Sequence, residues 1–114
     1  MDGQLIVRVK TGPTHVLMTL AGNLDATTGQ QLREGLASEV ARGTLRLIVD
    51  LSSVEFMDSQ AVHALLDLKT VLTGWGGLLA LASPQPIVAR VLSLMGADEL
   101  IPVVGSVAEA IALA

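Results

Sequence analysis

Apolar residues follow two different periods along the chain, one typical of strands and one typical of helices. Alternating or continuous apolar runs predict five strands, over residues 5–9, 15–20, 45–50, 78–82 and 101–104. Between them, apolar residues at helical spacing predict helices over about 25–42, 59–73 and 86–95, with a short fourth helix after residue 106. Strands that alternate with helices need crossover connections, so the order predicts a mostly parallel sheet that opens with an antiparallel hairpin.

Turn and cap residues set the expected boundaries of these elements. Thr11-Gly12-Pro13 predicts the hairpin turn, and Gly22-Asn23 is expected to break the second strand. Asp25 can cap the first helix, and Gly96 suits the end of the third. Ser106 and Glu109 fit the capping-box spacing at the start of the last helix. The nearly continuous apolar run over 45–50 predicts a central strand that is covered on both faces.

Composition limits the chain to one domain with an aliphatic core. Its 114 residues fit a single domain over residues 1–114, and 51% of them are hydrophobic. The longest run without a polar residue, Gly74 to Ala82, is far shorter than the ~18 residues of a membrane span. We therefore expect no membrane span. Because Phe56 and Trp75 are the only aromatic residues, Val, Leu, Ile and Ala must build the core.

Charge and residue types argue against several classes of function. The net charge is −4 and the seven basic residues are scattered, so nucleic-acid binding is not expected. The chain has no cysteine, and its two histidines form no recognisable metal constellation with the scattered carboxylates. Gly74-Trp75-Gly76-Gly77 lacks the Lys-Ser/Thr of a phosphate-binding loop. We expect no metal and no cofactor. The N-terminus does not resemble a signal peptide, so the expected location is the cytoplasm.

The predicted second helix is apolar over most of its circumference and has one narrow polar stripe. Ser59 or Gln60 begins the stripe, and His63, Asp67 and Thr70 continue it at helical spacing. His63 and Asp67 are four residues apart and can form a weak surface pair. The simplest interpretation of the stripe is an ordinary solvated helix face.

Ser59 lies where the third strand meets the second helix, and three roles are open for it. As a helix cap, its hydroxyl would accept a backbone N–H. As a nucleophile it would need a base, but His63 lies about 6 Å further along the same helix and no G-x-S-x-G motif is present. As a phosphorylation site it would place an anion at a helix N-terminus, where free N–H groups and the helix dipole favour negative charge. From these considerations alone, capping is favoured.

Four motifs then identify a family. Gly22-Asn23-Leu24-Asp25 resembles G-x-L-D, and residues 50–59, DLSSVEFMDS, resemble the D-L-S-x-V-x-F-x-D-S signature of STAS-domain proteins of the anti-sigma factor antagonist type. Residues 76–81 are similar to the family's G-G-x-L-x-L strand, and residues 88–96 to its segment that ends in glycine. The resemblance spans nearly the whole chain. It implies an α/β fold: a single STAS domain with a mixed, mostly parallel sheet packed against about four helices.

The resemblance also implies a function. Unphosphorylated antagonists of this kind bind an anti-sigma factor, often itself an ATP-using serine kinase, and so release a sigma factor. Phosphorylation of the serine that matches Ser59 ends binding, and a serine phosphatase resets the switch. The expected partner-binding residues are Asn23, Asp25, Met57, Asp58, Gln60, His63 and Asp67. The chain departs from the family pattern at Gln60 and Ala61, where a small Ser or Thr and then Gly are usual.

Two other functions stay open. A STAS domain can be an accessory subunit of a transport or stress-signalling complex, without a phosphorylation switch. A small enzyme is the other alternative, although the sequence offers no catalytic constellation around Ser59.

Overall fold

The computed structural model describes residues 4–113 and contains each of the nine predicted strands and helices. The strands are β1 (Ile6–Thr11), β2 (Val16–Leu24), β3 (Arg46–Met57), β4 (Leu78–Ala82) and β5 (Val103–Val104). The helices are α1 (Gly29–Ala41), α2 (Ser59–Gly74), α3 (Pro86–Leu94) and α4 (Val107–Leu113). A short 3₁₀ turn, η1 (Ala97–Glu99), was not predicted.

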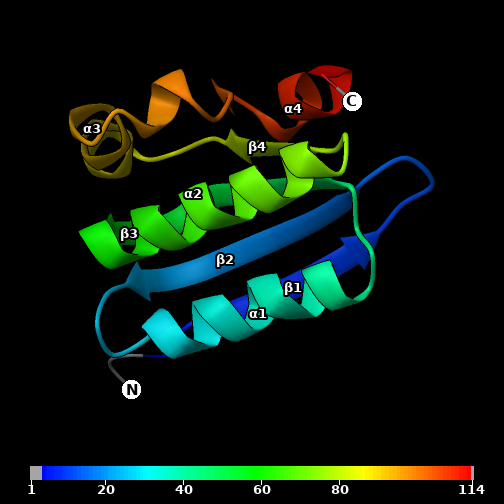
Figure 1. Ribbon diagram of the computed structural model, residues 1–114. Coiled ribbons are helices and arrows are strands. Elements are labelled where there is room, and N and C mark those ends of the chain that lie inside the picture. Colours follow the sequence, from blue (N-terminus) through cyan, green and yellow to red (C-terminus); the bar gives the residue numbers. More distant parts are fainter. Residues whose placement is uncertain (1–3, 114) are drawn as a thin grey trace.

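The five strands form one mixed sheet in the order β1-β2-β3-β4-β5 (Figure 1). β1 and β2 make the antiparallel hairpin, and the other three pairings are parallel. β3 is the central strand, and its first half is buried between β2 and β4. The structure thus confirms the predicted α/β class and the mostly parallel sheet.

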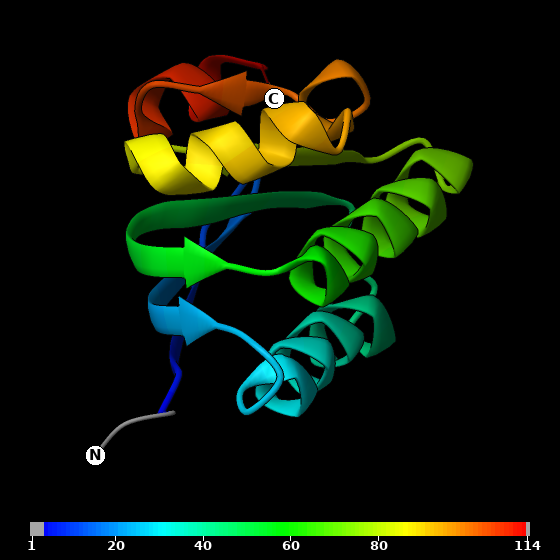
Figure 2. The ribbon, with the colours of Figure 1, turned by 90° about the vertical axis from the view of Figure 1, so that its left-hand side faces the viewer.

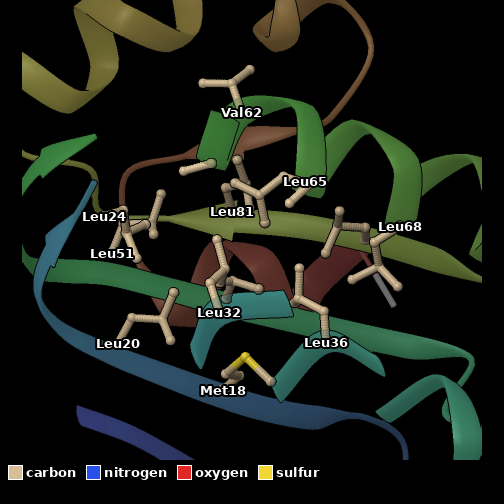
Figure 3. Packing of buried hydrophobic residues seen from close by; sticks show 14 of the residues in the cluster. Met18, Leu20, Leu24, Leu32, Leu36, Leu51, Val62, Leu65, Leu68 and Leu81 are labelled. Carbon is tan, nitrogen blue, oxygen red and sulfur yellow. The ribbon is translucent and has the colours of Figure 1, made fainter. Parts of the chain in front are cut away.

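Helices cover the two faces of the sheet unequally. α1 and α2 lie next to each other on one face (Figures 1 and 2), and α3 adds Val88 and Leu92 to the same hydrophobic cluster. Figure 3 shows how leucines from α1 and α2 meet the leucines and Met18 that project from the sheet. α4 covers the opposite face, where Ala110 packs with Ile48, Ala80 and Ala82.

The core is aliphatic, as composition predicts. Phe56 and Trp75, the two aromatic residues of the chain, are 41% and 50% exposed. Core stability therefore rests on many branched aliphatic side chains, and fully burying each contributes about 1.5–3 kcal/mol.

The largest errors in the predicted strand ends concern the β2–β3 pair, while the ends of β1 and β5 differ from prediction by one or two residues. β2 continues through Gly22-Asn23 to Leu24, and β3 continues past Asp50 to Met57. The strands stay paired because β3 carries one more residue than β2 at each of two bulges. Gly22, with φ +119°, suits this irregular stretch: a Cβ there would lie 2.7 Å from the carbonyl oxygen of Gln4. The glycine marks a bulge instead of a strand end.

The cap predictions for α3 and α4 are confirmed. Ser106 Oγ accepts a hydrogen bond from the Glu109 N–H at 3.1 Å, and Glu109 Oε2 accepts one from the Gly105 N–H at 2.7 Å. Gly96 follows α3 with φ +72°, the left-handed conformation that ends many helices. The predicted cap of the first helix is wrong, because α1 begins at Gly29, four residues after Asp25.

We predict that Gly77→Ala destabilises the protein by about 1–3 kcal/mol, because the added Cβ would collide with the backbone carbonyl of Leu45. Gly74→Ala is the matched control: the site is open, and alanine favours the helix. Urea unfolding followed by far-UV circular dichroism measures both changes. Equal urea midpoints for the two variants would mean that a Cβ at position 77 does not collide with the Leu45 carbonyl, which would contradict this prediction.

Candidate functional site

The candidate site lies where the parallel strands β2 and β3 end side by side. Leu24 and Met57 are partners in the strand register. Just beyond them, the Asp58 N–H donates a hydrogen bond to the Leu24 carbonyl oxygen at 2.9 Å. The residues that follow each strand, Asp25 and Asp58, are therefore brought to the same edge of the sheet, at the N-terminal end of α2.

Asp58, and not Ser59, caps α2. Asp58 has extended backbone angles, and its Oδ1 accepts a hydrogen bond from the Ala61 N–H at 3.0 Å. Ser59 is the first residue of the helix, is exposed, and donates or accepts no side-chain hydrogen bond among residues 4–113. The interpretation of Ser59 as a helix cap is thus wrong, and its hydroxyl is available to solvent.

The Asp25 side chain organises the loop that leads into α1. Its Oδ1 accepts hydrogen bonds from the backbone N–H groups of Thr27 at 2.9 Å and Thr28 at 3.2 Å. The buried Thr28 hydroxyl donates in turn to the Asn23 carbonyl oxygen at 2.6 Å. Asp25 therefore closes a tight turn in front of the helix, which explains why the helix starts later than predicted.

The structure brings together most of the residues predicted to bind a partner. Asn23, Ser59 and Gln60 are exposed at the shared strand end, with Asp25 and Asp58 half-buried between them. Met57 is different: it is 1% exposed and packs in the core, so its position does not fit a direct contact with a partner. Its register pairing with Leu24 instead makes it a support beneath the loop.

The polar stripe of α2 is solvent-facing, as predicted. Ser59, Gln60, His63, Asp67 and Thr70 are all exposed on the helix. The predicted surface pair of His63 and Asp67 is wrong: within residues 4–113, the one ion pair joins Arg42 Nη1 and Glu39 Oε2 at 3.8 Å. The exposed or half-buried residues at the shared strand end, from Asn23 and Asp25 to Asp58, Ser59 and Gln60, form the tip of the site. His63 and Asp67 lie one and two turns beyond Ser59, so they extend the site along the helix and do not belong to this tip.

The N-terminal end of α2 can hold an anion next to Ser59. The first amides of a helix have no partner within the helix, and Asp58 occupies one of them, that of Ala61. The N–H groups of Ser59 and Gln60 make no hydrogen bond in the described part of the chain, and the helix dipole adds positive potential there. A phosphoryl group on the Ser59 hydroxyl would therefore lie near two available donors, with the Asp58 carboxylate as its negative neighbour.

Phe56 belongs to this edge of the sheet, although sequence reasoning did not include it among the partner-binding residues. It pairs with Asn23 in the strand register and is 41% exposed. Neighbouring residues of a strand point to opposite faces, so the buried Met57 implies an outward Phe56. The sequence alone carried no signal for this position, because the predicted strand ended at Asp50 and the bulges break the alternation along 51–57.

Neither a cluster of metal-ligand side chains nor a membrane-spanning helix is found in the part of the chain that the structure describes. Residues 4–113 contain no group of three or more His, Asp or Glu side chains placed to hold a metal ion. No helix within the same range is long and apolar enough to cross a bilayer.

Comparison with known proteins identifies the family of this chain. The sequence model of the STAS domain matches residues 6–110, and the chain belongs to the STAS domain family. A Thermotoga maritima protein provisionally named as an anti-sigma factor antagonist is 32% identical over 69 residues. That alignment covers 60% of this chain and 61% of the relative, so the chain spans less than two thirds of it.

Solved structures show the same fold. An anti-sigma factor antagonist from Mycobacterium paratuberculosis superposes with a TM-score of 0.91 at 22% identity, over 99% of this chain and 96% of that one. The Bacillus anti-sigma factor antagonist SpoIIAA, at 23% identity, has been solved in an unphosphorylated form (TM-score 0.79) and a phosphorylated form (TM-score 0.71). The alignment covers 93% of this chain in both cases, and 93% and 96% of the two SpoIIAA chains.

We predict that Asp58→Ala lowers the free energy of unfolding by about 0.5–2 kcal/mol, because α2 loses its N-cap. Asp58→Asn should retain most of the stability, since the amide oxygen can accept the same hydrogen bond. Ser59→Ala is the neighbouring control and should change little, because its hydroxyl bonds to no described residue. Urea titration of the three variants measures this. If Ser59→Ala lowered the free energy of unfolding as much as Asp58→Ala does, the assignment of Asp58 as the cap would be contradicted.

Proposed function

We propose that this chain is an anti-sigma factor antagonist and that phosphorylation of Ser59 switches off its binding to an anti-sigma factor. The observation that carries the proposal is the position of Ser59: exposed, first in α2, and next to the acids that end two parallel strands. The names of the relatives and the two SpoIIAA forms support it. The proposed partners are an anti-sigma factor with serine kinase activity and a serine phosphatase.

The expected mechanism is a change of surface charge without a change of fold. A phosphoryl group would add about −1.5 to −2 charges at a tip that already carries Asp25 and Asp58. The free N–H groups at the start of α2 would tolerate this charge within the folded domain. A partner that buries the unmodified tip would instead meet an anion that it must desolvate, so the complex would dissociate.

The two departures from the family pattern have different consequences for a kinase. Ala61 is 4% exposed and its N–H is taken by Asp58, so its methyl group faces the protein interior. A kinase that approaches Ser59 would not touch it. Gln60 is exposed beside Ser59, so the bulk and hydrogen bonds of its side chain are the feature that a matching kinase must accept.

The first test of the proposal is partner capture from the host's lysate with wild type, Ser59→Ala and Ser59→Asp as baits. We expect an ATP-binding anti-sigma factor with wild type and Ser59→Ala, and at least tenfold less of it with Ser59→Asp. Ser93→Asp, an exposed serine of α3, is the charge-matched control and should bind as wild type does. Equal binding by all baits would leave a STAS scaffold without a switch. A transporter subunit as the captured partner would favour the accessory-subunit function.

Asp25→Ala should weaken binding or phosphorylation while costing only about 1 kcal/mol of stability, the usual effect of losing a capping side chain. The side chain closes a turn at the surface and does not support the core. Calorimetric titration of the purified partner, beside a melting curve, separates the two effects, with Asp98→Ala on η1 as the control. A large fall in melting temperature would mean that Asp25 is mainly structural.

A further inference from the structure

A groove of about 220 Å³ lies between α1 and α2, and Asp67 of the polar stripe is one of the residues that line it. Its lining is mostly apolar, with the buried Leu36 and Leu68 at its base and Val40 and Val71 along it. It is open because Ala37 and Ala64, which also line it, project only methyl groups into the space between the helices. The volume is below the ~300–1,000 Å³ of sites for small molecules, and suits one or two aliphatic side chains.

One charge of each sign borders the groove. Arg33 of α1 and Asp67 of α2 both line it, and neither takes part in an ion pair or hydrogen bond among residues 4–113. An apolar side chain that enters the groove would therefore meet a free guanidinium on one helix and a free carboxylate on the other. A segment that carries an acidic and a basic residue around its apolar residue would satisfy both.

The groove is close enough to Ser59 to lie under the same partner. Asp67 borders the groove and is eight residues from Ser59, about 12 Å along the helix. A stable interface covers roughly 800 Å² on each partner, which is a patch roughly 30 Å across. A partner centred on Ser59 would therefore extend over His63 to Asp67. The tip itself is polar, and binding energy in interfaces comes mainly from apolar or aromatic groups in well-packed pockets.

We propose that the α1–α2 groove is the part of the anti-sigma factor interface that supplies affinity. It receives an apolar side chain from an amphipathic segment of the anti-sigma factor, with a basic residue of that segment on Asp67 and an acidic one on Arg33. The polar tip with Ser59 then controls whether the partner stays bound. This inference rests on the proposed function.

The test is calorimetric titration of the purified anti-sigma factor into variants that block the groove. Ala37→Glu and Val71→Glu place a carboxylate in the apolar lining from each helix, at positions exposed enough to leave the fold intact. Both should raise the Kd at least tenfold. Ser38→Glu, on the same helix but outside the groove, is the matched control and should bind as wild type does. Melting temperatures should agree among all three.

Charge reversal tests the orientation of the bound segment. Asp67→Lys and Arg33→Glu should each weaken binding more than Asp98→Lys and Arg90→Glu, which make the same charge changes on η1 and α3. The inference is overturned if groove variants bind like wild type while Ser59→Asp still releases the partner. It is also overturned if the only effect of the groove variants is to convert a dimer of this chain into monomers. Failure of wild type to bind any anti-sigma factor would overturn the proposed function, and this inference with it.

Discussion

The parallel pairing of β2 and β3 is the interaction on which both the core and the candidate site depend. Its inward side chains, among them Met18, Leu20 and Leu51, form the surface on which α1 and α2 pack. Its last hydrogen bond, from the Asp58 N–H to the Leu24 carbonyl, holds the two loops together. Because both loops begin at the ends of paired strands, the sheet holds the site in place, which is what a recognition surface on loops requires.

The periodicity of apolar residues was sufficient to predict the type and order of the five strands and four α-helices, although not the short 3₁₀ turn η1. It was insufficient for the ends of β2 and β3, because a strand extends as far as a neighbour pairs with it, and that neighbour is distant in sequence. Gly22 shows the ambiguity: the same residue type breaks a strand or allows a bulge, and local sequence does not distinguish the two. With the two bulges, residues 51–57 are buried at every third position instead of every second, so the strand pattern was not followed past Asp50.

In the site, the sequence indicated which residues meet but not how each is oriented. Asp58 and Ser59 are adjacent hydrogen-bond acceptors, and a shift of one residue decides which of them caps α2. That shift is set by the last register pair of the sheet, Leu24 with Met57. The same pair decides that Met57 is buried and Phe56 exposed. A prediction of orientation would have needed the bulge positions, which are a property of two strands together.

Trp75 is an intrinsic fluorescent probe at one end of α2. It follows α2 directly, half-exposed, at the opposite end of the helix from Ser59, about 24 Å away. As the only indole in the chain, it is a single energy-transfer donor at a known place. Transfer to an acceptor dye on a bound protein would depend on how far that protein reaches along α2. Contact confined to the tip and contact along the whole helix would therefore differ in tryptophan emission, without any engineered label on this chain.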